Sequence, residues 1–182
     1  MSDIQVILVD EYDNPTGTME KLEAHRRGLR HRAISVYVFN RAGKLLLQRR
    51  AAGKYHCGGL WSNTCCGHPY PDEAARLAAE RRLFEEMGVR VPLHKQFEFS
   101  YCLELPGGMT ENEFGHIFAA LDDQRPQPDP EEADDFRYVA LADLEQEMAA
   151  QPERFTPWFL ICYPAFKDHL RNHGGLSALS TA

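Results

Sequence analysis

The most helical stretch of the chain runs from Asp72 to Met87, and its charged residues constrain the fold more than any other feature. A proline–aspartate pair at its start favours a helix N-terminus, Ala, Leu, Arg and Glu fill its body, and Gly88 ends it. Arg81, Glu85 and Glu86 fall within little more than one turn, so their side chains share a face or its edge. Such a face is either a solvated surface with an i, i+4 ion pair or a carboxylate site for a hard cation such as Mg²⁺.

Short runs of β-branched and aliphatic residues surround this helix. They predict strands at residues 4–9, 32–39, 44–49, 96–105, 114–121 and 136–139, of which the second and third form a hairpin across residues 40–43. Further helices are expected at 20–27, 141–150 and 157–170, and loops at 13–17, 51–63 and 122–135. The sequence therefore predicts one α/β (α+β) domain over residues 1–173, with a mixed sheet between helices, and a disordered tail at 174–182.

Composition narrows the classes of ligand and compartment. The net charge of −7 argues against nucleic acid as a partner, and an anionic ligand would require the basic residues to be concentrated locally. No apolar run approaches the roughly 20 residues of a membrane span, and the N-terminus lacks the pattern of a signal peptide. The five cysteines are odd in number, and Cys65 and Cys66 are adjacent, which favours free thiols. We expect a cytoplasmic protein, monomeric or weakly dimeric, without a membrane partner and with a small-molecule ligand.

The spacing around the long helix resembles the Nudix box, G-x5-E-x7-R-E-U-x-E-E-x-G-U, where U is aliphatic. Gly67, Glu73, Arg81, the Glu85–Glu86 pair and the Gly88–Val89 pair all stand in register. The resemblance implies a Nudix fold and a diphosphate ligand bound through metal.

Arg82 is the one departure from this pattern, because the family has a glutamate there. Nudix hydrolases generally use the box carboxylates to collect several metals and to activate a water molecule for attack on phosphorus. A cation at this position weakens such a metal cluster and adds a partner for phosphate, so it argues against hydrolysis.

A second group of chemical residues is scattered along the chain. His25, His31 and His68 lie near expected strand ends or turns, and Glu111 and Glu113 face the same side if their segment is extended. No short metal motif joins them, so spacing alone favours a structural or incidental role for each histidine over a metal-binding one.

A wider resemblance covers residues 4–170 and is more specific than the box. Several segments recur in order, and at similar separations, in the type I isopentenyl diphosphate isomerases. They are Lys21 with His25 and His31, Arg49–Arg50 with Lys54, Asn63 to His68, Glu111–Asn112–Glu113, and Pro157–Trp158. The resemblance implies an enzyme of isoprenoid biosynthesis that interconverts isopentenyl diphosphate and dimethylallyl diphosphate.

Site residues follow from this resemblance, residue by residue. A divalent metal would be held by His25, His31, His68, Glu111 and Glu113. Such a mixed nitrogen and oxygen site suits Mn²⁺ or Zn²⁺ better than Mg²⁺, although Mg²⁺ can occupy it. A second ion, Mg²⁺ on the diphosphate, would map to Glu86. The diphosphate itself would be bound by Lys21, Arg50, Lys54 and Arg82.

Moving a double bond requires a proton to be added to one carbon and another to be removed, which implies a tertiary carbocation. We predict that Cys66 and Glu113 transfer these protons from opposite faces of the alkene, with Tyr101 relaying or orienting one of them. Trp158 would shield the cation with its ring, and Trp61 is a weaker candidate for the same wall. Two alternatives stay open at this point: a Nudix hydrolase acting on another diphosphate, and a non-catalytic Nudix-fold module that binds a phosphorylated ligand.

Overall fold

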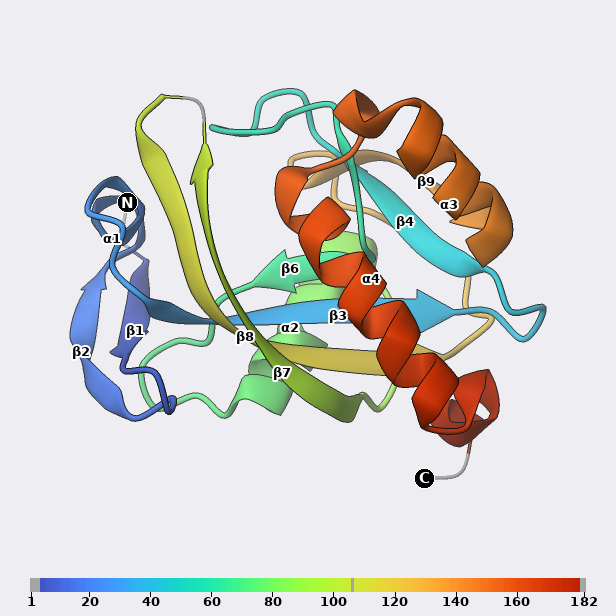
Figure 1. Ribbon diagram of the computed structural model, residues 1–182, viewed down its shortest axis with the longest axis horizontal. Helices are drawn as coiled ribbons and strands as arrows, with labels where there is room; N and C mark the ends of the chain where they lie inside the picture. The colour runs from blue at the N-terminus through green and yellow to red at the C-terminus, as the bar shows by residue number, and fades with distance from the viewer. Residues whose placement is uncertain (1–3, 106, 181–182) are drawn as a thin grey trace.

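The structure, a computed structural model, describes residues 4–105 and 107–180 (Figure 1). Its strands are β1 (Gln5–Val9), β2 (Pro15–Glu20), β3 (His31–Phe39), β4 (Leu45–Arg50), β5 (Trp61–Ser62), β6 (Cys65–Gly67), β7 (His94–Leu105), β8 (Met109–Leu121) and β9 (Ala133–Val139). Its helices are α1 (Lys21–Arg26), α2 (Ala75–Met87), α3 (Leu141–Ala150) and α4 (Pro157–Asn172), with short 3-10 helices η1 (Pro152–Arg154) and η2 (Gly175–Ser180).

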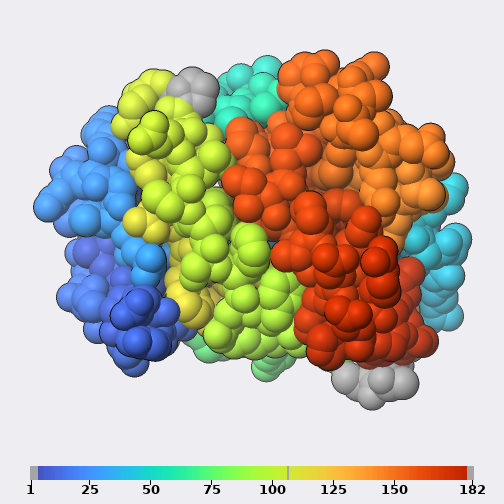
Figure 2. Space-filling model, in the orientation of Figure 1, coloured from blue at the N-terminus to red at the C-terminus, as the bar shows by residue number. Residues whose placement is uncertain are grey.

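The described strands form one mixed sheet, and β3 is its most connected strand. It runs antiparallel to β1 and β6 and parallel to β8, which in turn pairs along its length with β7. Helices α3 and α4 lie in front of the sheet in Figure 1, and α2 lies behind it. The space-filling view shows that the side chains of α3, α4 and β7 cover most of the front face (Figure 2). The predicted mixed sheet between helices is confirmed.

Alternating side chains of the central strands pack into two separate hydrophobic cores, one on each face of the sheet. Tyr37 and Phe39 of β3 point to the α4 side, where the Tyr37 ring stacks on Phe166 at a centroid distance of 3.9 Å. Val36 and Val38 point to the opposite side, where they pack with residues of α2. The strand pattern read from the sequence is thus explained by burial on both faces.

Helix α2 ends where its glycine predicts. Gly88 adopts a left-handed conformation (φ 66°) and donates its N–H to the carbonyl of Phe84. A β-carbon at this position would approach the carbonyl oxygen of Gln127 to 2.7 Å, so both conformation and space require glycine.

The structure differs from the sequence expectation in the N-terminal half. Residues 13–17 were expected to form a loop, but Pro15–Glu20 is a strand paired with β1. The turn closes earlier because the Asp10 carboxylate accepts the N–H groups of Tyr12 and Asn14. The predicted hairpin is only partly present, since β3 and β4 share the single register pair Phe39 and Leu45 and then separate.

The C-terminal end also differs. Residues 174–182 were expected to form a disordered tail, yet Gly175–Ser180 forms η2, and Leu179 is buried in the core beneath α4. This apolar anchor is what holds the segment. Residues 1–3, 106 and 181–182, which include the ends of the predicted domain and tail, lie outside the described residues. Within the described ranges, no helix has the length and apolar content to cross a membrane.

Candidate active site

A cavity of about 290 Å³ is lined by residues of both α2 and α4, at the end of the sheet where β3 and β8 begin. Its walls come from α1, the loop after β4, β6, the second half of α2, the strand pair β7–β8 and α4. The predicted site residues that line it are Lys21, His25, Arg50, Lys54, Cys66, His68, Arg82, Glu86, Tyr101, Glu111, Glu113 and Trp158. His31 lies directly behind them and is fully buried.

Trp61 is not brought to the cavity. Its ring is buried at the far end of β5, where the guanidinium groups of Arg49 and Arg137 lie 5.8 and 4.5 Å from its centroid. The prediction that Trp61 helps to shield a carbocation is therefore not supported by its position.

Strand register brings the first pair of functional residues together. His31, the first residue of β3, stands opposite Glu113 of β8, and Glu113 in turn stands opposite Tyr101 of β7. Glu111 lies two residues earlier on the extended strand β8, so it faces the same side as Glu113, as its spacing predicts.

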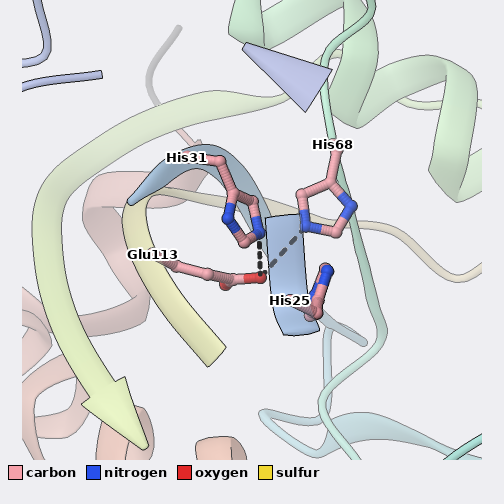
Figure 3. Close-up of side chains that lie close together, drawn as sticks. All are labelled: His25, His31, His68 and Glu113. Carbon is pink, nitrogen blue, oxygen red and sulfur yellow. Dashed lines mark hydrogen bonds and ion pairs between the residues drawn. The ribbon is translucent and has the colours of Figure 1, made fainter. Parts of the chain in front are cut away.

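Three imidazoles converge on the Glu113 carboxylate (Figure 3). One possible ligand atom from each of His25, His31, His68 and Glu113 lies within 4.8 Å of the others. Oε1 of Glu113 is 3.1 Å from Nε2 of His68 and 3.7 Å from Nε2 of His31. This clustering is what a divalent cation with imidazole and carboxylate ligands requires.

The backbone fixes the tautomers of two of these histidines. Nδ1 of His25 donates to the carbonyl of Lys21 (2.6 Å), and Nδ1 of His31 donates to the carbonyl of Leu29 (2.8 Å). In neutral imidazoles the Nε2 lone pairs then face the cluster, and neither Nε2 atom has a hydrogen-bond partner among the described residues. Buried lone pairs oriented in this way are typical of metal-binding histidines, so the donor set fits a divalent metal.

His68 is kept neutral by its surroundings. Burial, and then the neighbouring His31 and Lys21, hold the pKa of His68 well below its ordinary value. A neutral imidazole is the form that binds metal.

Glu111 lies beside this cluster rather than inside it. Its Oε2 is 3.4 Å from Nε2 of His25, and its Oε1 is 3.2 Å from Nε2 of His56. His56 was not predicted, because it lies in an irregular, glycine-rich loop where no periodicity or motif marks it.

Cys66, on β6, also lines a wall of the cavity. Its thiol donates to Oδ1 of Asn63 (3.2 Å), and Oγ of Ser35 lies 3.5 Å from its sulfur. Burial raises the pKa of Cys66 to about 12, although its hydrogen-bond contacts with Ser35 and Asn63 act in the other direction. The thiol is therefore fully protonated at neutral pH, and its thiolate is more costly than that of a free cysteine.

Glu113 is in the opposite state. Burial alone would raise its pKa, but its buried polar neighbours, His31 and then the hydroxyl of Tyr101, outweigh it and lower the pKa to about 2. The Tyr101 hydroxyl donates to Oε2 of Glu113 at 2.7 Å. A protonated thiol and an ionised carboxylate thus line the same cavity.

Cationic side chains gather in the end of the cavity next to Arg82, in the second half of α2. The predicted diphosphate-binding residues Lys21, Arg50, Lys54 and Arg82 all line it. Glu132, which was not predicted, pairs with Lys54 and lies 3.4 Å from Arg82. An anion is thus expected at this end of the cavity despite the negative net charge.

Arg82 is the residue that departs from the Nudix box. It contacts Glu86 (2.6 Å) and Glu85 (2.7 Å), while Gln48 donates to the other oxygen of Glu86. A side chain at Gly67 would meet Cγ of Arg82 at 2.9 Å, so the box glycine leaves the room that this arginine occupies.

Two further box residues, Arg81 and Glu73, stabilise the site. Arg81 makes a two-point contact with Glu73 (2.8 and 2.7 Å) and also donates to the carbonyl of His68 (3.2 Å). These bonds tie α2 to the segment that carries His68.

Trp158 of α4 closes the cavity next to the cysteine wall. Its indole N–H donates to Oγ of Ser62 (3.1 Å), and its ring lies 5.4 Å from that of His56 and 5.2 Å from the Arg50 guanidinium. The polar edge is satisfied, which leaves the ring face as an apolar wall.

Comparisons with known proteins agree with this architecture. The model of the NUDIX domain matches residues 29–159. A protein of Deinococcus radiodurans (TM-score 0.68, 20% identity, 81% of this chain and 90% of that one) and a MutT protein of Methanosarcina mazei (TM-score 0.62, 18% identity, 76% and 94%) share the fold.

Relatives at higher identity narrow the family. The isopentenyl-diphosphate Delta-isomerase of Pectobacterium atrosepticum is 49% identical over 165 residues, which cover 91% of this chain and 92% of that protein. Isopentenyl-diphosphate Delta-isomerase 2 of Aromatoleum aromaticum is 52% identical over 158 residues, 87% of this chain and 84% of that protein. The chain therefore belongs to the NUDIX family and, within it, to the isopentenyl-diphosphate Delta-isomerases.

Proposed function

We propose that this protein interconverts isopentenyl diphosphate and dimethylallyl diphosphate, by protonation and deprotonation through a tertiary carbocation. The observation that carries the proposal is the pairing of Cys66 and Glu113 in one cavity with opposite resting protonation states. Two titratable groups whose environments push their pKa values apart are the usual arrangement of an acid and a base.

Proton transfer in this scheme leaves the total number of protons on the pair unchanged but exchanges their protonation states, which proton exchange with solvent then restores. One group gives a proton to an alkene carbon, and the other takes a proton from a neighbouring carbon, so the double bond moves and the charge of the substrate is unchanged. Tyr101 orients the Glu113 carboxylate through its hydroxyl, and Ser35 and Asn63 orient the thiol of Cys66.

The cationic end of the cavity would hold the diphosphate. Lys21, Arg50, Lys54 and Arg82 supply charge-assisted donors for its oxygens. The ring of Trp158 lies where it can face a cationic intermediate, an interaction of about 0.5–2 kcal/mol, and its burial helps to keep out the water that would capture the cation.

Metals complete the proposal. His25, His31, His68, Glu111 and Glu113 would hold Mn²⁺, Zn²⁺ or Mg²⁺, and Glu86 would hold the Mg²⁺ of the diphosphate. When bound, these ions supply positive charge, which sets the acidity of Glu113 and offsets the charge of the substrate.

Hydrolysis is the alternative that the box suggests, and the contacts within the box count against it. Glu73 is engaged by Arg81, and Glu85 and Glu86 are engaged by Arg82. Three carboxylates paired with arginine are poorly placed to gather the several metals of a Nudix hydrolase, whereas the one Mg²⁺ proposed above would require only Glu86 to be released from Arg82.

Incubation with isopentenyl diphosphate and Mg²⁺, followed by proton and phosphorus NMR, tests the proposal. Signals of dimethylallyl diphosphate without release of phosphate are expected. Inorganic phosphate or a monophosphate instead would identify a hydrolase, and no conversion by metal-loaded protein would favour a binding module.

A further inference from the structure

His56 is a buried residue of the cavity to which the proposed chemistry gives no role. It lies in the loop between β4 and β5, and its side chain is only 7% exposed. Neither of its ring nitrogens has an aligned hydrogen-bond partner among the described residues. Leaving the nitrogens of a buried imidazole unpaired is costly, so a polar atom within reach is expected to pair with one of them.

Packing orients the His56 ring from two sides. The ring of Tyr55 meets it edge-on at 4.3 Å, and the ring of Trp158 meets it edge-on at 5.4 Å. Held in this way, Nε2 of His56 lies 3.2 Å from Oε1 of Glu111.

Glu111 is thereby placed between two imidazoles. Its other oxygen, Oε2, is 3.4 Å from Nε2 of His25, one of the clustered donor atoms. The geometry gives the carboxylate one oxygen for the cluster and one for His56.

His56 itself stands outside the cluster. Its ring centroid is 6.4 Å from that of His25, compared with 4.7 Å for His31 and 5.7 Å for His68. It also supplies no atom to the group of donors within 4.8 Å of one another. His56 is therefore placed to act on a metal-binding residue, Glu111, rather than to bind the metal itself.

We propose that His56 is a positioning residue for the metal site, whose Nε2–H donates to Oε1 of Glu111 and so directs Oε2 toward His25. The inference rests on the metal site proposed above and adds a residue to it. Partners of this kind orient metal-binding carboxylates, and their loss weakens metal affinity by about 10–100-fold.

Two substitutions separate this role from simple packing. His56→Phe keeps the ring between Tyr55 and Trp158 but removes the donor. His56→Gln places an amide N–H near the position of Nε2 but removes the ring. Thermal unfolding in EDTA establishes that each variant is folded.

The measurement is Mn²⁺ affinity, followed by the EPR signal of free Mn²⁺ without substrate. His56→Phe is expected to bind about 10–100-fold more weakly than the wild type, and His56→Gln to stay within a few-fold of it. Wild-type affinity in His56→Phe, together with weak binding in His56→Gln, would overturn the inference and make the ring a packing element.

A double-mutant cycle of His56 and Glu111 provides a second test if His56→Gln proves unstable. In the Glu111→Gln background, His56→Phe is expected to have little further effect, because both act through one contact. Additive losses would contradict the inference. Absence of Mn²⁺ binding by the wild type would instead refute the proposed metal site, and the positioning role with it.

Discussion

Glu113 and His31 face one another across the parallel pair β8 and β3, with Oε1 of Glu113 3.7 Å from Nε2 of His31. The same carboxylate accepts a hydrogen bond from Tyr101 on β7. The sheet register therefore gives Glu113 two roles: it lies in the histidine cluster, and it takes part in the proposed proton transfer. A slip of one residue in β8 would turn both Glu111 and Glu113 to the opposite face.

Replacement of Glu113 tests both of these roles. Glu113→Gln keeps the shape of the side chain but removes the base and the anionic ligand, so turnover is expected to fall by about 10²–10⁴-fold or more while the fold survives. Activity assays with far-UV circular dichroism check this. Glu104→Gln, on an exposed part of β7, is the matched control and should behave as the wild type. Normal turnover in Glu113→Gln would remove this residue from the chemistry.

The raised pKa of Cys66 predicts poor reactivity toward alkylating agents, because only the thiolate reacts. With a pKa of about 12, its alkylation by iodoacetamide at pH 8 should be roughly a thousandfold slower than that of a thiol with a pKa near 8.5. The rate should rise with pH up to about 12. Peptide mass spectrometry measures each cysteine separately, and fast labelling of Cys66 at pH 7 would show that its thiolate is accessible.

The brace between Arg81 and Glu73 predicts a dependence of stability on pH. The Arg81 contact lowers the pKa of Glu73 below its ordinary value of 4.5. Its stabilisation is thus present above that value and is lost as the pH falls through the lower, folded-state pKa. Glu73→Gln should lower the free energy of unfolding at pH 7 by about 1–3 kcal/mol, and the difference from the wild type should shrink in acid. Urea unfolding measures this.

Asp168→Asn is the control for the brace, since Asp168 makes only an exposed contact of 3.8 Å with Arg171. Its effect on the free energy of unfolding should be too small to measure. A difference for Glu73→Gln that persists unchanged at low pH would contradict the electrostatic account.

Arg82 should matter for substrate affinity more than for stability. Arg82→Gln removes a charge-assisted donor for the diphosphate, which is worth about 1.5–3 kcal/mol, and kcat/KM should fall by about 10–100-fold. Arg76→Gln, on the exposed side of the same helix, is the matched control. Steady-state kinetics measures both variants. A kcat/KM of Arg82→Gln equal to that of the wild type would show that Arg82 only forms ion pairs within the helix.

Much of the fold follows from local sequence. The run of β-branched and aliphatic residues over 32–39 predicts a strand, and Gly88 predicts the end of α2. The spacing of Glu111 and Glu113 predicts their common direction. These are short-range signals, in which each residue reports its own backbone and burial.

Long-range pairing could not be predicted in the same way. His31 meets Glu113 only because β3 and β8 run in parallel, and nothing in either segment specifies that partner. Strand β2 was missed because the side chain of Asp10 closes its turn, and η2 was missed because it is anchored by leucines that pack against a distant core. The pKa of Cys66 depends on burial by distant segments, and His56 lies in a loop without a pattern.

Conversion of isopentenyl diphosphate in D₂O with Mg²⁺, followed by proton and phosphorus NMR, tests the central claim most directly. We expect dimethylallyl diphosphate that carries deuterium, without phosphate release. The same product should form with Cys65→Ala, whose thiol packs in the opposite core, but not with Cys66→Ala. Phosphate release, or deuterated product from Cys66→Ala at the wild-type rate, would contradict the account.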